Sequence, residues 1–389
     1  MFRALTDQGK DDLLSRGYSR RHMLRAAMLV GGGASALAMH PEIAFAADAP
    51  ARGRIQISLN ECWTGPMAPG AKAAADVIAQ CNRYSPNDER GRLIKAISAM
   101  EKIPEDHIVP WPGSNEALAR SVVAFCSPTK GLVTADPTYE TPGTAAKYIG
   151  APIKAVPLTA DYRHDVKAML AANPKAGLYY VCSPNNPTGT LTPMTDIEWL
   201  VANKPAGAIV VVDEAYIHFT SGYPGNTATH LVAAGKDVLI LRTFSKIFGM
   251  AGMRVGFAMG RPDLLVKLNM HDDGALNTDL PIPSVACATA SLTQTGLIAD
   301  RRKQLAEVRG MTVDFLKKHN LRLILPTETN MLMVDWKTKT AHEMQTAFRA
   351  QGVEISRTFP AWPTVSRITI GSKADMEGFF AALNKVVSA

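Results

Sequence analysis

Five short apolar segments alternate with stretches of helical length in the middle of the chain, and this alternation limits the possible folds more than any other property. The segments are rich in β-branched residues and cover residues 131–135, 153–158, 177–182, 208–213 and 238–243. Continuous apolar runs of this kind are typical of strands buried on both faces of a sheet. The pattern therefore predicts an α/β fold with a mainly parallel central sheet covered by helices.

The pattern changes after residue 273, where a long helical stretch continues to residue 318. Further apolar segments follow at 321–325, 330–336 and 367–371, which indicates a smaller α+β domain. A chain of 389 residues is long enough for two domains of ~100–200 residues each. We predict a leader at 1–46, an N-terminal arm with part of the small domain at 47–80, a large domain at 81–273 and the small domain at 274–389.

The first 46 residues have the composition of a targeting segment. A Ser-Arg-Arg-His-Met-Leu-Arg run ending at Arg25 precedes an apolar stretch at 26–39, which resembles a twin-arginine export signal. The stretch is shorter than the ~20 residues that a membrane-spanning helix requires, so we expect no stable membrane anchor. Small residues at 44–46 predict cleavage after Ala46 and a periplasmic or secreted protein. The alternative is an amphipathic helix with chance arginines, which the glycines at 31–33 disfavour.

Charge and cysteine content exclude two classes of function. The 42 Lys and Arg residues exceed the 35 Asp and Glu residues by seven, but they are scattered and form no basic run interleaved with aromatic residues. A nucleic-acid interface is therefore not expected. The five cysteines are odd in number and lack paired spacing, so they predict neither a disulfide framework nor a metal site.

Polar residues follow directly after several of the predicted strands. They occur at 136–139, 183–189, 213–216 and 243–246. Ligands of such sheets bind at the carboxyl ends of the strands. The positions of these residues therefore predict one shared site at that edge of the sheet.

Lys246 ends a Thr-Phe-Ser-Lys run just after a predicted strand, and an Ala-Gly-Met-Arg run ending at Arg254 follows it. This arrangement resembles the Schiff-base lysine motif of the class I/II aminotransferases, which are pyridoxal 5'-phosphate (PLP) enzymes of fold type I. The resemblance implies that Lys246 binds PLP covalently. It also implies that Thr243, Ser245 and Arg254 hold the phosphate, for which the planar guanidinium fork is well suited.

Asp213 ends a run of four buried aliphatic residues, where a carboxylate is costly unless it meets a cation or hydrogen-bond donors. By resemblance, Asp213 pairs with the protonated pyridine nitrogen. Tyr216 then donates to the phenolic oxygen of the cofactor, with Asn186 as its companion. The Asn-Pro-Thr-Gly stretch around Asn186 is also an ordinary turn sequence.

Four further residues match the family. Ser114 and Asn115 stand where a loop enters a helix, and the free N–H groups there attract an anion such as phosphate; a plain N-cap at Ser114 is the alternative. The resemblance implies that Tyr139 stacks on the pyridine ring, although it could also be a packed core tyrosine. Tyr84 matches a tyrosine that reaches the phosphate of a neighbouring subunit, which implies a homodimer with shared active sites.

Arg367 stands at the family position that binds the α-carboxylate of the substrate in bidentate fashion. The alternative is that Arg367 forms a surface salt bridge. The sequence motifs Asp-Glu-Ala-Tyr and Asn-Asn-Pro-Thr-Gly most resemble those of histidinol-phosphate aminotransferases. Arg357 then falls near the arginine that this subfamily uses for the distal phosphate of its substrate. The run Asn-Glu-Cys-Trp, which ends at Trp63, departs from the Asn-Glu-Asn-Pro-like sequence usual in the family. Trp63 then stands near the family position of a tyrosine that helps to hold substrate.

The resemblance implies a transaminase that moves an amino group between an amino acid, histidinol-phosphate-like or aromatic, and a 2-oxo acid. Lys246, once free, acts as the base, because burial near other positive charge lowers the pKa of an amine. Another PLP enzyme, a lyase, racemase or cyclase acting on an exported amino acid, peptide or secondary metabolite, is the alternative. A protein that binds an amino-acid-like ligand without turnover is a third hypothesis.

Overall fold

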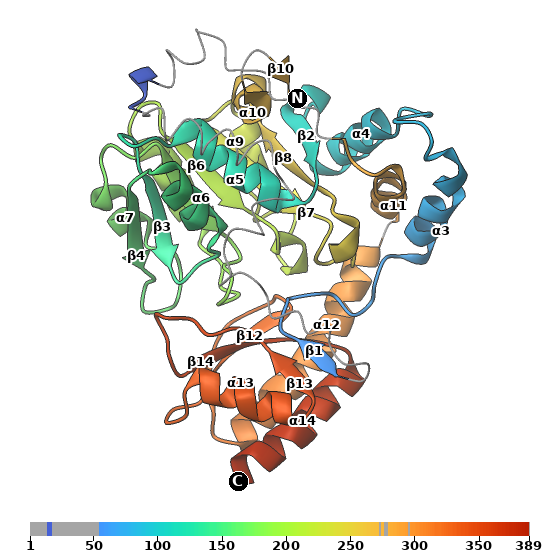
Figure 1. Cartoon of the computed structure of the whole chain (residues 1–389), viewed down its shortest axis with the longest axis vertical. Coiled ribbons are helices and arrows are strands. Elements are labelled where there is room, and N and C mark those ends of the chain that lie inside the picture. Colours follow the sequence, from blue (N-terminus) through green and yellow to red (C-terminus); the bar gives the residue numbers. More distant parts are fainter. Residues whose placement is uncertain (1–13, 18–53, 272–273, 276–278, 295, 389) are drawn as a thin grey trace.

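The computed structural model describes residues 14–17, 54–271, 274–275, 279–294 and 296–388 (Figure 1). The predicted leader, its twin-arginine motif and the cleavage point after Ala46 lie outside these residues, apart from 14–17. Within that short piece, Arg16 donates a hydrogen bond from Nη2 to the carbonyl oxygen of Ala124 (2.9 Å).

The centre of the molecule is a seven-stranded sheet with the order β2-β8-β7-β6-β5-β3-β4. Its strands are β2 (Ile108–Trp111), β3 (Leu132–Asp136), β4 (Ile153–Pro157), β5 (Leu178–Cys182), β6 (Ile209–Asp213), β7 (Val238–Thr243) and β8 (Gly256–Gly260). Only β8 runs against its neighbours, being antiparallel to both β7 and β2. The predicted α/β fold with a mainly parallel sheet is confirmed, and each of the five predicted strands is present.

Helices cover both faces of this sheet. On β6, Val210 and Val212 pack into one apolar cluster while Ile209 and Val211 pack into the other, as the two-residue period of a strand requires. One cluster contains side chains from α5 (Ser114–Phe125), α6 (Thr141–Ile149) and α10 (Pro262–Asn269). The other contains side chains from α7 (Val166–Ala172), α8 (Met194–Asn203) and α9 (Thr229–Ala233). Burial on both faces explains why the strands read as continuous apolar runs.

Three helices form a group beside the sheet. Helix α11 (Ile282–Leu292) packs against α3 (Ala68–Asp76) and α4 (Glu89–Glu101). The contact with α3 is close, since a Cβ on Gly70 would lie 2.9 Å from the carbonyl oxygen of Cys287. The long helical stretch expected after residue 273 is thus divided. Helix α12 (Leu297–Lys318) begins anew at Gly296, whose φ of +81° is a left-handed conformation that favours glycine.

The C-terminal part contains an antiparallel sheet of β11 (Arg322–Ile324), β12 (Met331–Asp335) and β14 (Val365–Thr369). It also contains α13 (Ala341–Ala350) and α14 (Lys373–Ser388). Strand β1 (Ile55–Ile57) joins this part by pairing in parallel with β13 (Val353–Ile355). Figure 1 shows this lobe below the large sheet, with α12 running between the two and β1 beside β13. From β1 in the lower lobe, the chain therefore passes between the lobes before the large sheet begins.

None of the helices among the described residues combines the length and the apolar composition that crossing a membrane requires. In the same part of the chain, no three or more His, Cys, Asp or Glu side chains are grouped in a way that could hold a metal ion.

Candidate active site

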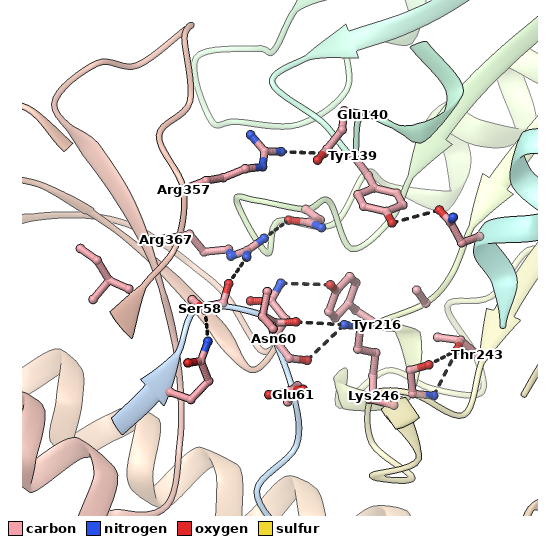
Figure 2. Close-up of a pocket in the computed structure, with 18 of the residues that line it drawn as sticks. Ser58, Asn60, Glu61, Tyr139, Glu140, Tyr216, Thr243, Lys246, Arg357 and Arg367 are labelled. Carbon is pink, nitrogen blue, oxygen red and sulfur yellow. Dashed lines mark hydrogen bonds and ion pairs between the residues drawn. The ribbon is translucent and has the colours of Figure 1, made fainter. Parts of the chain in front are cut away.

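A cavity of about 850 Å³ lies at the carboxyl edge of the large sheet, between the two lobes (Figure 2). Its walls come from the ends of β5, β6 and β7, from the start of α5, and from β1, β13 and β14. Twelve of the fourteen residues that the sequence assigned to the site line this cavity.

The two other assigned residues, Trp63 and Tyr84, do not line the cavity of this chain. Trp63 is partly buried and packs against the main apolar core. Tyr84 has an exposed fraction of 90%. A tyrosine so exposed has no role in the cavity of its own chain.

Lys246 follows the end of β7, and its amine points into the cavity (Figure 2). Its Nζ donates to the carbonyl oxygen of Asn60 (3.1 Å), on the segment that follows β1. Burial and, to a smaller extent, the positive charge of Arg367 lower the pKa of Lys246 to about 8. The shift has the direction expected of an amine that must act as a base near neutral pH.

Asp213 is the last residue of β6 and is buried at the floor of the cavity. One carboxylate oxygen accepts from the hydroxyl of Tyr180 on β5 (2.9 Å), and the other from the backbone N–H of Ala215 (3.1 Å). Burial raises the pKa of Asp213 above its usual value, so this carboxyl would gain from a cationic partner. Sequence reasoning missed Tyr180, because its place in an apolar run gave no sign that its hydroxyl has a partner.

Tyr216 presents its hydroxyl to the cavity from the segment after β6. Its oxygen accepts a hydrogen bond from Nδ2 of Asn60 (3.0 Å), and burial raises the pKa of Tyr216, so the hydroxyl keeps its proton. That proton remains available to donate to a ligand. Sequence reasoning missed Asn60 as well, because it stands in the Asn-Glu-Cys-Trp run that departs from the family pattern.

The end of the cavity near α5 forms a cradle for an anion. Helix α5 begins at Ser114, and its N-cap is Gly113, which has a φ of +78°; Ser114 is therefore not the N-cap. The Oγ of Ser245 accepts from Arg254 Nη1 (3.3 Å) and from the hydroxyl of Thr243 (2.9 Å). A Cβ on Gly113 would lie 2.5 Å from Arg254 Nη2. This space, bounded by a helix N-terminus, hydroxyls and a guanidinium, suits a phosphate group.

Tyr139 and Asn115 are joined at the side of this cradle. The hydroxyl of Tyr139 donates to Oδ1 of Asn115 (3.0 Å), as Figure 2 shows. Tyr139 is only partly buried and lines the cavity. It is therefore open to a ligand on the cavity side, unlike a packed core tyrosine.

Arg367, on β14, reaches the cavity from the lower lobe. It donates from Nη1 to Oδ1 of Asn186 (2.7 Å) and from Nη2 to the carbonyl oxygen of Ser58 (2.5 Å). Its Nε is buried without a hydrogen-bond partner, and no ion pair to Arg367 is present among the described residues. An arginine with an unpaired donor and no acidic partner suits a carboxylate ligand, and the alternative of a surface salt bridge does not apply.

Arg357 lines the outer end of the cavity and forms an ion pair with Glu140 (2.6 Å). Glu140 follows Tyr139 directly and precedes α6. Sequence reasoning missed Glu140, because nothing in the sequence links it to a residue more than two hundred positions later.

The arrangement combines a buried amine, a buried carboxylate, a cradle for an anion and a free arginine in one cavity. These are the groups that PLP and an amino acid substrate require: an amine for the aldehyde, an acid for the pyridine nitrogen, donors for the phosphate and an anchor for the α-carboxylate. The residues present therefore fit the cofactor that the sequence predicted.

Comparison with known sequences gives the same family. Residues 54–383 match the family described as Aminotransferase class I and II. A histidinol-phosphate aminotransferase of Moorella thermoacetica is 31% identical over 339 residues, which is 86% of each chain. An aromatic amino acid aminotransferase of Rhodococcus jostii is 34% identical over 257 residues, which is 64% of this chain and 71% of the relative.

Solved structures show the same fold. A putative histidinol-phosphate aminotransferase from Erwinia carotovora atroseptica superposes with a TM-score of 0.80 at 28% identity, over 86% of this chain and 96% of that one. The histidinol-phosphate aminotransferase from Sinorhizobium meliloti, solved in complex with pyridoxal-5'-phosphate, has a TM-score of 0.76 at 23% identity and covers 86% and 90% of the two chains. On its sequence, its fold and the groups in its cavity, the chain belongs to the class I and II aminotransferases.

Proposed function

We propose that this aminotransferase binds PLP through Lys246 and transfers the amino group of an amino acid to a 2-oxo acid. The observation that carries the proposal is the position of the Lys246 amine, whose pKa is lowered to about 8, in one cavity with Asp213 and Arg367. When bound, PLP supplies an electron sink for the pair of electrons left when the α-proton departs.

The residues of the chain then have distinct tasks. Arg367 would hold the α-carboxylate with its guanidinium, and the neutral amine of Lys246 would remove the α-proton and deliver it to the aldehyde carbon of the cofactor. Asp213 keeps the pyridine nitrogen protonated, and Tyr216 donates its proton to the phenolic oxygen.

The test is a half-reaction with single amino acids. Enzyme saturated with PLP is mixed with one amino acid at a time, and the visible absorption of the lysine-bound cofactor is followed. We expect it to disappear with formation of one 2-oxo acid and one pyridoxamine phosphate per site. Release of ammonia with an eliminated fragment would instead identify a lyase.

Attachment to Lys246 is tested separately. Borohydride reduction followed by peptide mass analysis should place a pyridoxyl group on Lys246. Lys246→Ala should remove both the label and the half-reaction while the fold, followed by circular dichroism, is retained. A label on another lysine would contradict the assignment of the site.

We propose further that the enzyme is a homodimer. The support is Tyr84, whose exposed fraction of 90% is unusual for an aromatic side chain, together with Ile78 at 60% on the preceding turn. Exposed aromatic and aliphatic residues are enriched in subunit interfaces. Family resemblance assigns Tyr84 to the phosphate of the neighbouring subunit.

We also propose that the enzyme is exported by the twin-arginine route. The support is the sequence of residues 1–46 alone. Fusion of residues 1–50 to a reporter protein should carry the reporter to the periplasm, and replacement of Arg20 and Arg21 by Lys should retain it in the cytoplasm. A fusion that stays in the cytoplasm with both arginines present would contradict export.

A further inference from the structure

We propose that Glu140 is a specificity-determining residue: by neutralising Arg357 at the outer end of the cavity, it selects substrates with one carboxylate and an uncharged side chain. The inference rests on the proposed transamination and names its substrate class. It follows from the partners of the charged side chains on the substrate side of the cavity.

Four arginines line that side, and three have acidic partners. Arg54 pairs with Glu354 (2.9 Å), and Arg349 pairs with the same carboxylate (2.9 Å). Arg357 pairs with Glu140 (2.6 Å). The fourth, Arg367, forms no ion pair with an acidic side chain among the described residues. The cavity therefore offers a single uncommitted guanidinium on this side, enough for one carboxylate.

The Glu140–Arg357 pair also has a defined place. Glu140 belongs to the upper lobe and Arg357 to the lower lobe, and Figure 2 shows the pair across the cavity from Asn60 and Lys246, beyond Arg367. A substrate held by Arg367 would thus extend its side chain toward this pair. The ring of Phe359 lies under both guanidiniums, 4.7 Å from Arg357 and 6.0 Å from Arg367.

The pair is half-exposed, with side-chain exposed fractions of 48% for Arg357 and 54% for Glu140. Exposed ion pairs contribute little to stability. The effect of the Glu140–Arg357 pair on selectivity is larger. A second anion on the substrate would have to compete with Glu140 for Arg357, and the Glu140 carboxylate would repel it.

The experiment compares the wild-type enzyme with E140Q, which removes the charge and keeps the shape. The half-reaction kcat/KM is measured for L-phenylalanine and L-leucine, and for L-glutamate and O-phospho-L-serine. We expect the wild type to favour the first two. E140Q should raise kcat/KM for the two anionic side chains about tenfold, through the charge-assisted bonds that Arg357 can then form, and leave L-phenylalanine within about twofold.

Ground-state binding provides a readout that does not depend on turnover. Calorimetry should show that E140Q lowers the dissociation constant of glutarate, which has two carboxylates, and leaves that of 3-phenylpropionate unchanged. The double variant E140Q/R357Q should lose the gain for glutarate and for L-glutamate. E140D, which keeps the charge, should resemble the wild type.

The matched control is E377Q on α14, where Glu377 has a side-chain exposed fraction of 58% and does not line the cavity. It removes the same charge from the protein and should not change the ratio of anionic to neutral substrates. If the wild type prefers L-glutamate, or if E140Q leaves that ratio unchanged, the inference fails while transamination stands. If no amino acid reacts with the wild type, the proposed function fails and the inference fails with it.

Discussion

Lys246 shows at the scale of one residue how a catalytic group opposes stability. The folded chain holds its amine in a cavity, beside Arg367, and burial there lowers the pKa from 10.5 to about 8. A pKa that is lower in the folded protein means that the folded state disfavours the charged amine. At neutral pH the cofactor-free protein therefore carries an energetic cost at this position.

That cost can be measured with Lys246→Met, which keeps the length of the side chain without its charge. The pKa difference predicts that the cofactor-free variant is more stable than the cofactor-free wild type at pH 7, by up to about 3 kcal/mol. Between pH 8 and pH 10.5 the unfolded wild type binds more protons than the folded one, so wild-type stability rises with pH and the difference narrows. Urea unfolding at pH 7 and pH 10 checks both statements. A difference that widens with pH would contradict them.

Tyr180 provides a second prediction at this scale. Its hydroxyl donates to Asp213 (2.9 Å) and orients the carboxylate meant for the pyridine nitrogen. Tyr180→Phe should weaken PLP binding about tenfold, the value of one hydrogen bond to a charged group, and should shift the pH at which the bound cofactor changes its absorption. The control is Tyr179→Phe, because the Tyr179 hydroxyl donates to the carbonyl oxygen of Asn173 and not to Asp213. Equal effects of the two variants would argue against an orienting role.

Sequence motifs predicted the residues that touch cofactor or substrate better than the residues that support them. Lys246, Asp213 and Arg367 occur in recognisable local runs. Tyr180 and Glu140 act through partners that are distant along the chain, Asp213 and Arg357, and those pairings depend on how the strands and lobes are arranged. No local pattern records such contacts.

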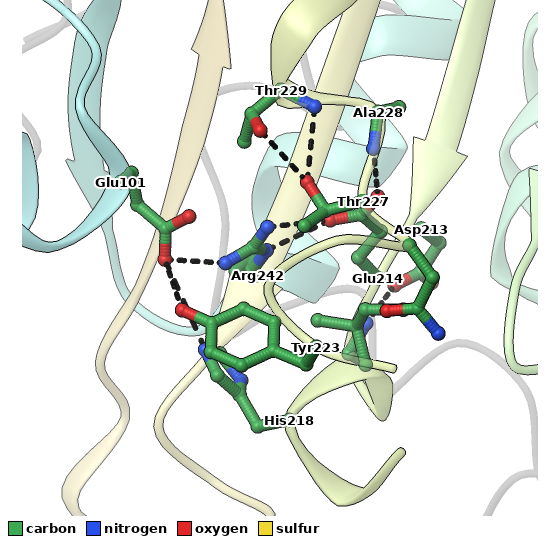
Figure 3. A network of polar contacts seen from close by, with 12 residues as sticks. Glu101, Asp213, Glu214, His218, Tyr223, Thr227, Ala228, Thr229 and Arg242 are labelled. Atoms are coloured by element: carbon green, nitrogen blue, oxygen red, sulfur yellow. Dashed lines mark hydrogen bonds and ion pairs between the residues drawn. The ribbon is translucent and has the colours of Figure 1, made fainter. Parts of the chain in front are cut away.

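At the scale of elements, a buried ion network joins α4 and β7 to the residue that follows β6 (Figure 3). Arg242 on β7 is fully buried and lies between Glu101, the last residue of α4, and Glu214, which follows Asp213. Glu214 also accepts from the backbone N–H of Ala228 (2.7 Å). The network fixes the ends of the strands that carry Asp213 and Lys246.

Arg242→Met should therefore destabilise the protein by about 3–5 kcal/mol, because two buried carboxylates would lose their cation. Urea unfolding measures the change. Arg261→Met is the control: in its ion pairs with Asp237 and Asp263 the arginine side chain is 32% exposed and open to solvent, so its effect should stay near 1 kcal/mol or below. A similar loss in both variants would show that burial of the network contributes little.

In the large sheet, the strands with a strong local sequence pattern were predicted, and the strands without such a pattern were missed. The five predicted strands consist mostly of aliphatic and aromatic residues and are buried in the sheet. Strand β8 has the sequence Gly-Phe-Ala-Met-Gly, and β2 contains a proline, so neither has the composition of a typical strand. Their positions depend on pairing with β7 and with each other, which a local pattern cannot show.

At the scale of the whole molecule, the site exists only because the two lobes meet. Arg367 from the lower lobe bonds to Asn186 from the upper lobe, and Arg357 pairs with Glu140 across the same gap. The pairing of β1 with β13 brings residues about three hundred positions apart together. The sequence predicted two domains, but their relative placement follows from packing.

Tyr84 makes the proposed dimer testable at this scale. Its side chain is 90% exposed and lies outside the cavity of its own chain, so in a monomer the loss of its hydroxyl could not affect the cofactor. In a dimer with shared sites, Tyr84→Phe should leave the sedimenting mass at twice that of the chain and raise the dissociation constant for PLP several-fold, through one lost bond to the partner's phosphate. Tyr148→Phe, at a partly buried tyrosine beside the core, is the matched control and should change neither quantity. A fully active monomer, or a dimer in which both variants bind PLP as the wild type does, would show that this hydroxyl does not reach a neighbouring site.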